Sequence, residues 1–278
     1  MKIGFVTDST AYIPDELLEQ FNIQVVPVKV IISGAAHSEG IDVSVSDVIA
    51  AFGDGKAVTT SRPSSNDFIE TYQGLLDRGF DEIISVHLSA ELSGTYESAL
   101  LAVAKSELPV RVINSHNIAS AVGFAVVGGA RLAATGASID DVEDYIRNRC
   151  ELTRTLFFVD TLDYLQRGGR ISSVQLRLGT ALSLKPILAV ADGKIVQQEL
   201  VRNSERAFLK MVEIAVTVKD VDCDIAVLHV ATQAKAEKLA SQISKKLDGK
   251  QVHVYPAGAV VATHLGPGAI ALVLSRQI

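Results

Sequence analysis

The sequence contains no tryptophan, and aromatic residues make up only 5% of its 278 residues. Because 48% of the residues are hydrophobic, the core must be built from aliphatic side chains, and a disordered chain is excluded. The 26 basic residues are outnumbered by 32 acidic ones, and no basic run of five or more occurs. This balance argues against a nucleic-acid partner.

Cysteine and long apolar stretches are also scarce. The two cysteines, Cys150 and Cys223, lie far apart, which favours a reduced, cytoplasmic protein over a disulfide-bonded one. No window of about 18 uninterrupted apolar residues occurs, so we expect no membrane span. The first residues run straight into a strand-like segment, so we expect no signal peptide. The six histidines show no zinc spacing, and no Walker sequence occurs, so no metal and no cofactor are expected.

What is present is an alternation of short apolar runs with amphipathic stretches. This pattern predicts an α/β protein of two domains, residues 1–152 and 153–278. We expect a mostly parallel sheet with helices on both faces in the first domain, and a mixed sheet with helices in the second. Two such domains in contact leave a crevice, which is the usual place for a ligand.

The periodicity also predicts individual elements, and Ser46 and either Ser64 or Ser65 are expected to cap the second and third helices. Asp192-Gly193 is a favoured hairpin turn. The expected strands are residues 2–7, 23–32, 82–86, 110–113, 154–159, 184–190, 194–200, 225–230, 252–255 and 269–274. The expected helices are residues 14–20, 47–52, 66–78, 94–105, 119–135, 140–148, 161–167, 173–180, 204–216 and 235–247.

Four clusters of small and polar residues are suited to holding one anion. Each sets a hydroxyl, imidazole or guanidinium beside glycine or proline, where the backbone turns sharply. Such groups recognise a carboxylate or phosphate by hydrogen bonding. Ligands of parallel sheets bind beyond the carboxyl ends of strands, where we expect Asp8-Ser9-Thr10 and the first two clusters. The four clusters are Thr60-Ser61-Arg62-Pro63-Ser64, Leu92-Ser93-Gly94-Thr95-Tyr96, Gly168-Gly169-Arg170-Ile171-Ser172 and Thr263-His264-Leu265-Gly266-Pro267-Gly268.

The first two clusters each have a structural alternative. Ser93 is well placed as the N-cap of the helix that follows it, but the same helix end attracts an anion. Thr60 and Ser61 have no capping task, because Ser64 or Ser65 fills that role. This modestly favours ligand binding by Thr60 and Ser61.

The last two clusters also each have a structural alternative to ligand binding. Gly168 and Gly169 are suited to a helix C-cap, and Arg170 could neutralise the carbonyls there or recognise a carboxylate. His264 could be an ordinary core histidine, although its place in a glycine-rich loop favours a binding role.

Six motifs, in this order and at these separations, resemble the DegV family of bacterial fatty-acid-binding proteins over the whole chain. The sequence departs from the family pattern at Ala90, Arg62 and Leu265, where the family often has Ser, Gln and Thr. Besides the four clusters, the motifs are Thr7-Asp8-Ser9-Thr10 and Leu184-Lys185-Pro186-Ile187-Leu188, and the third cluster extends back to Asp160.

The resemblance implies a protein that buries one long-chain fatty acid between its domains. In the family, residues matching Thr60 and Ser93 hold the carboxylate, and those matching His264 and Arg170 lie close by. We expect Ser61 and Gly94, their neighbours in the motifs, to belong to the same ligand-binding site.

The resemblance also implies a partner, a separate fatty acid kinase that phosphorylates the bound carboxylate with ATP and so feeds phospholipid synthesis. Arg202 matches a surface arginine of the family and is our candidate for docking that kinase. The alternative is a solvated arginine, or one paired with Glu199 or Glu205.

Two other functions remain open from the residues alone. The first is an acyl or phosphate-ester hydrolase that uses Ser93 and His264, although no nucleophile elbow occurs and no motif places an acid beside His264. The second is a regulator that binds a nucleotide or sugar phosphate through the same clusters.

Overall fold

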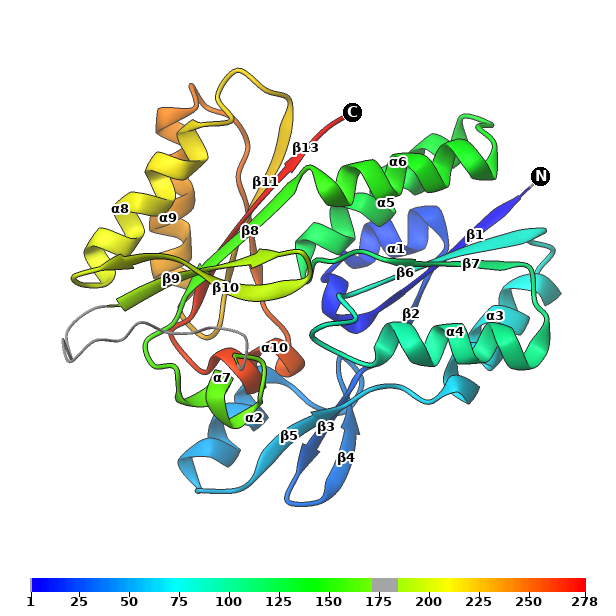
Figure 1. Cartoon of the computed structure of the whole chain (residues 1–278), viewed down its shortest axis with the longest axis horizontal. Helices are drawn as coiled ribbons and strands as arrows, with labels where there is room; N and C mark the ends of the chain where they lie inside the picture. Colours follow the sequence, from blue (N-terminus) through cyan, green and yellow to red (C-terminus); the bar gives the residue numbers. More distant parts are fainter. Residues whose placement is uncertain (1, 172–184) are drawn as a thin grey trace.

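Three sheets organise the protein, and helices cover or connect them (Figure 1). The computed structural model describes residues 2–171 and 185–278. The helix expected at residues 173–180 therefore lies outside the described residues, as do Ser172 and Leu184. None of the helices within these two ranges is long and apolar enough to cross a membrane.

The first sheet is four-stranded and entirely parallel, in the order β2-β1-β6-β7. Its strands are β1 (Ile3–Asp8), β2 (Ile23–Val26), β6 (Glu82–His87) and β7 (Val110–Asn114). The central strands β1 and β6 are buried along almost their whole length, whereas the edge strands β2 and β7 are partly exposed. All four strands run parallel. This confirms the predicted parallel sheet of the N-terminal half.

Helices pack on both faces of this sheet, as predicted. One face is covered by α1 (Asp15–Phe21), α5 (Ser120–Ala134) and α6 (Ile139–Glu151). The other is covered by α3 (Ser65–Asp77) and α4 (Thr95–Ser106). Helices α4, α5 and α6 bury mostly small and aliphatic side chains, whereas α3 buries Phe68 and Tyr72.

The second sheet is six-stranded and mixed, in the order β10-β9-β8-β13-β11-β12, and only β11 and β12 pair in parallel. Helices α8 (Ser204–Val216) and α9 (Gln233–Lys246) cover one face, and the opposite face contributes to the core shared with the N-terminal half. The predicted mixed sheet is confirmed. Its strands are β8 (Thr153–Phe158), β9 (Lys185–Ala191), β10 (Lys194–Val201), β11 (Cys223–His229), β12 (His253–Pro256) and β13 (Ile270–Arg276).

A third, small sheet was not predicted. The strand expected at residues 23–32 is two strands of different sheets, because Pro27 has no N–H for a ladder and the amide of Val28 donates to Ser9 instead. The small sheet has the order β4-β3-β5 and is antiparallel. Its strands are β3 (Lys29–Ile32), β4 (Ala35–Ser38) and β5 (Val58–Ser61).

Three short helices and one 3-10 turn connect the sheets. Helix α10 (Ala259–Leu265), which was not predicted, packs against β3, β5, α2 (Val45–Gly53) and α7 (Asp163–Arg167). The turn η1 (Ser9–Ala11) follows β1. The small sheet belongs to the first half of the chain yet packs on α10 near the end of the chain. The domain boundary at residue 152 stays a prediction.

The structure corrects one cap and confirms another. Ser44, not Ser46, caps α2, because Ser44 and Asp47 form a reciprocal capping box. Ser64 caps α3 in the same way. Asp192 and Gly193 both have positive φ, which is the geometry of the predicted hairpin turn between β9 and β10.

Candidate functional site

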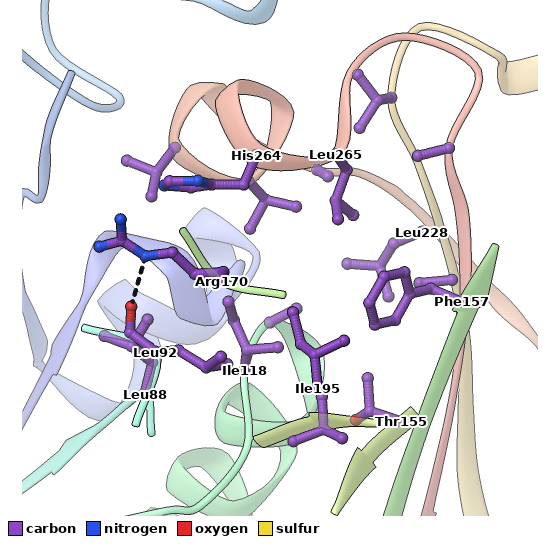
Figure 2. Close-up of a pocket in the computed structure, with 18 of the residues that line it drawn as sticks. Leu88, Leu92, Ile118, Thr155, Phe157, Arg170, Ile195, Leu228, His264 and Leu265 are labelled. Carbon is purple, nitrogen blue, oxygen red and sulfur yellow. Dashed lines mark hydrogen bonds between the residues drawn. The ribbon is translucent and has the colours of Figure 1, made fainter. Parts of the chain in front are cut away.

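A largely apolar pocket lies between the two halves of the chain and has about 880 Å³ of space, including the part open to solvent. Leu88, Leu92 and Ile118 line it from the N-terminal half, and Phe157 and Ile195 from the C-terminal half (Figure 2). Its largely aliphatic lining is typical of a site for an apolar ligand.

Four predicted site residues, Thr60, Ser93, Arg170 and His264, line this one pocket. Figure 2 shows Arg170 and His264 at one end and Thr155 at the other, with aliphatic side chains between them. Residues up to 204 positions apart in the chain therefore meet at one end of the pocket. We call Thr60, Ser93, Arg170 and His264 the polar clamp.

His264 is in the last turn of α10, not in a glycine-rich loop as expected. The apolar run before it is helical, and the helix ends only at Gly266, whose φ is +71°. This helix directs the imidazole toward β5, where Nε2 of His264 and Oγ1 of Thr60 share a hydrogen bond of 2.8 Å.

The imidazole of His264 is uncharged at neutral pH. Burial, together with the nearby Arg170 guanidinium, lowers the pKa of His264 to about 4. Its Nδ1 is buried and has no hydrogen-bond partner among the residues that the structure describes. Nδ1 lies so close to Gly168 that a Cβ there would be 2.2 Å away, which explains a glycine at this position.

Ser93 is not the N-cap of the helix, contrary to the structural alternative considered above. The N-cap of α4 is Gly94, which has no side-chain cap bond. Oγ of Ser93 lies 2.9 Å from Oγ1 of Thr95 and accepts a hydrogen bond of 3.3 Å from the Thr95 amide. A hydroxyl has one donor and two acceptor positions, so Ser93 retains bonding capacity.

Arg170 takes the first of the two roles considered for it, because it bonds a carbonyl at the helix end, and recognition of a carboxylate stays a prediction. Its Nη1 donates to the carbonyl of Gly168 at the end of α7, and its Nε donates to the carbonyl of Leu92 at 3.1 Å. Partial burial lowers the pKa of the guanidinium, which remains charged at neutral pH. Arg170 therefore links the Gly168 turn to the segment that carries Ser93.

The remaining predicted residues lie outside the lining of the pocket. Ser61 is exposed, and Gly94 lies under Arg62, whose Cδ would be 2.7 Å from a Cβ on Gly94. Arg202 is exposed, and Glu199 pairs with Lys210 at 3.2 Å. Ligand binding by Ser61 and Gly94, and docking by Arg202, stay predictions.

Asp8 is the last residue of β1 and Ser9-Thr10 follow it at the carboxyl end of the strand, as expected, but none of the three lines the pocket. The Asp8 carboxylate accepts from the Thr10 and Leu88 amides and lies 3.1 Å from His87 Nδ1. Its hydrogen-bonding positions are thus taken by protein groups. Ser9 donates instead to Glu39.

Sequence reasoning missed the pocket walls. The alternation along β8 could have shown them, because Leu156 and Phe158 pack beneath α8 and α9 whereas Phe157 faces the opposite cluster. Walls contributed by the loop at Leu88 and by Ile118 carry no such periodic signal.

The fold and the pocket together define an α/β protein with an aliphatic binding pocket that ends in hydroxyl, imidazole and guanidinium groups. A model described as the DegV family matches residues 2–277, and the chain belongs to this family. A DegV domain-containing protein of Streptomyces coelicolor, SCO2569, is 39% identical over 99% of both chains.

Solved structures agree with this assignment. A DegV family protein from Thermus thermophilus, described by its fatty acid binding, superposes with a TM-score of 0.93 at 29% identity, covering 99% of this chain and 100% of the other. DegV from Bacillus subtilis, described as a fatty acid binding protein, gives 0.91 at 31% identity over the full length of both chains. Fatty acid binding is thus a property of DegV family proteins.

Proposed function

We propose that this protein is a carrier that binds one long-chain fatty acid in the apolar pocket, with its carboxylate at the polar clamp. The observation that carries the proposal is the polar clamp, which gathers four polar side chains at one end of a largely apolar pocket whose lining otherwise includes only Thr155 and His229 as polar side chains among the described residues. That distribution matches the ligand, which is a single anionic group on a long hydrocarbon chain.

The apolar pocket supplies most of the affinity in this proposal. At roughly 0.8 kcal/mol per buried CH₂, a chain of about 16 carbons gains on the order of 12 kcal/mol before the costs of binding. The clamp mainly orients the head group, with Thr60 and Ser93 as neutral donors. Because these hydroxyls form no buried salt bridge, the carboxylate oxygens stay available for chemistry by a partner.

The hydrolase alternative receives less support. A serine hydrolase needs a base on the serine and an acid that orients this base. Ser93 Oγ bonds to Thr95, His264 Nε2 bonds to Thr60, and Nδ1 of His264 has no partner in the described part of the chain. The clamp therefore fits a binding site better than a nucleophile with its base.

Extraction of the purified protein with organic solvent, followed by mass spectrometry, tests the carrier. Near-stoichiometric long-chain fatty acid is the expected result. Recovery of a nucleotide or sugar phosphate in its place would refute the proposal, and turnover of p-nitrophenyl esters that is lost in Ser93→Ala would support the hydrolase.

Ser93→Ala tests the clamp itself. Removing one hydrogen bond to a charged carboxylate is expected to cost roughly 1.5–3 kcal/mol of binding free energy. The melting temperature of the fatty-acid-free protein should fall only slightly, through the loss of the two hydrogen bonds to Thr95. Ser241→Ala, at an exposed serine of α9 outside the pocket lining, is the control. Unchanged fatty-acid displacement by the Ser93 variant would remove Ser93 from the site.

The carrier's partner in this proposal is a separate, ATP-dependent fatty acid kinase, which would make the protein part of phospholipid synthesis. Arg202 is exposed at the start of α8 and is the proposed docking residue. Arg202→Ala should keep fatty-acid affinity and slow phosphorylation by a cognate kinase at limiting carrier. Equal rates for mutant and wild type would reject this docking role. The two buried free thiols, Cys150 and Cys223, support a cytoplasmic location.

A further inference from the structure

A second cavity adjoins the polar clamp on the side away from the apolar pocket. This outer groove has about 740 Å³ of space, including that open to solvent. Thr60, Arg170 and His264 line both the groove and the apolar pocket. These three side chains therefore form a partition between the apolar pocket and the outer groove.

The outer groove differs from the pocket in its charge. Lys56 and Arg167 line it in addition to Arg170, and its described lining includes no acidic residue. Lys56 forms a 2.9 Å ion pair with Asp54, but both side chains are about half exposed or more, so this pair contributes little and leaves Lys56 available.

Arg167 also has free hydrogen-bonding capacity. Its guanidinium lies 4.9 Å from the centre of the Tyr164 ring, and its Nε donates to the backbone carbonyl of Asp163. Tyr164 in turn packs on Phe52, with ring centres 4.7 Å apart. The ring thus supports the guanidinium, and only its Nε forms a hydrogen bond within the described residues, so its Nη1 and Nη2 groups can bind an anion.

We infer that the outer groove is a phosphoryl subsite, which holds the phosphoryl group of an acyl phosphate against Lys56 and Arg167. This inference rests on the proposed function. When a kinase phosphorylates the bound acid, a carboxylate oxygen forms a bond to the γ-phosphorus of ATP. The bond from that phosphorus to the β–γ bridging oxygen breaks, and ADP leaves with the electron pair.

The head group of the acyl phosphate carries more negative charge than the carboxylate of the fatty acid. A phosphate ester bears about −1.5 to −2 charges at neutral pH, against −1 for a carboxylate. The aliphatic pocket cannot accept this charge without a large desolvation cost. The phosphoryl group must therefore lie on the groove side of the partition, where the three cations are.

The test compares two probes, a long-chain fatty acid and the phosphonate analogue of its acyl phosphate, which does not hydrolyse. The double variant Lys56→Gln/Arg167→Gln should bind the phosphonate about tenfold more weakly and the fatty acid within about twofold of wild type. Lys219→Gln is the matched control, because Lys219 also forms an exposed 2.9 Å ion pair, with Asp248. It should change neither affinity.

Salt dependence gives a second readout. Wild-type affinity for the phosphonate should fall with ionic strength more steeply than affinity for the acid, and the double variant should lose this difference. Equal effects of the double variant on both probes, or on neither, would overturn the subsite. Failure of the wild type to bind the fatty acid would instead refute the carrier function.

Discussion

Two histidines of this protein lie beside a serine or threonine hydroxyl, and their surroundings differ completely. Nε2 of His87 is 2.7 Å from Oγ of Ser85, and its Nδ1 is 3.1 Å from the Asp8 carboxylate. His264 bonds to Thr60 through Nε2, and its Nδ1 has no partner in the described part of the chain. The first arrangement contains the residues of a hydrolytic triad, but all three are at most 1% exposed.

The His87 network is fully bonded within the protein. Tyr72 donates to Ser85 at 2.8 Å, and the Asp8 carboxylate also accepts from the amide of Leu88. Because Leu88 begins the loop that leads to Ser93, the network fixes the start of a pocket wall. It leaves no position for a substrate, so its role is structural.

The comparison shows that residue types alone do not identify a reactive site. A buried polar group that has all its partners stabilises one conformation, whereas one with unused hydrogen-bonding capacity beside a cavity is available to a ligand. By this criterion we place the proposed function at the partly open His264 site rather than at the serine, histidine and aspartate that resemble a catalytic triad.

The largest expected effect is on the fully bonded His87 network. His87→Ala should lower the free energy of unfolding by about 3–5 kcal/mol, because it empties the space of a fully buried ring and removes its hydrogen bonds to Ser85 and Asp8. Denaturant unfolding of the fatty-acid-free protein measures this loss. His264→Ala is the matched control, and it should cost much less stability because this ring already lies beside a cavity. Equal losses in the two variants would contradict the distinction between the two histidines.

Glu39 is a third buried polar group, and its partners come from distant parts of the chain. Its carboxylate accepts from Ser9 at 2.5 Å and from the Val260 amide in the first turn of α10 at 2.8 Å. Burial raises the pKa of Glu39 to about 7, with a smaller contribution from the charge of Asp8, and the phenol of Tyr12 packs nearby. Glu39 thus joins the start of the chain to the helix that carries His264.

The raised pKa makes stability depend on pH. Because the folded-state pKa lies above the usual 4.5, the neutral form stabilises the fold, and this contribution disappears as pH rises from about 4.5 to about 7. Glu39→Gln keeps an acceptor for Val260 and cannot ionise. It should therefore be more stable than wild type by roughly 3 kcal/mol at pH 8, and equal to it near pH 4.5.

Chemical denaturation of both proteins across this pH range measures the difference. The lowered pKa of His264 has the opposite sign, since its stabilising contribution is lost as pH falls from about 6.5 to about 4. The contribution of His264 is the same in the wild type and in Glu39→Gln, so it cancels when the two are compared. A difference that does not change with pH would show that Glu39 does not titrate in this range.

Sequence periodicity predicted most of the fold because the spacing of apolar residues reflects which side chains are buried. The parallel β1 and β6 strands and helix α8, whose bounds match residues 204–216, follow from apolar runs and capping residues. The small sheet was missed because β4 and β5 are four residues long and largely exposed, so they carry little apolar signal. Pro27 is the residue from which the end of β2 could have been predicted.

The clamp could be predicted only in part. The motifs indicated Thr60, Ser93, Arg170 and His264 but not their distances, because hydrogen bonds between distant segments leave no local periodicity. Helix α10 was overlooked since its seven residues are mostly small or β-branched and read equally as a strand or loop. The His264 environment therefore had to come from the structure.

The smallest effect concerns two adjacent glycines that the sequence could not distinguish. Gly168 has an ordinary helical φ of −73°, but a Cβ there would be 2.2 Å from Nδ1 of His264. Gly169 has a φ of +71°, and a Cβ there would meet nothing within 4 Å. Gly168 is thus required because it lies so close to His264, whereas Gly169 is favoured because of its left-handed backbone conformation.

Alanine at each position separates these causes. Gly168→Ala should displace the imidazole and weaken fatty-acid binding about tenfold, with an overpacking cost of about 1–3 kcal/mol in stability. Gly169→Ala should cost about 1–2 kcal/mol of stability through its left-handed backbone and leave affinity unchanged. Displacement titrations and thermal melts of both variants measure the two effects. Equal losses of affinity would mean that the turn acts as a whole, and that His264 is not the group displaced.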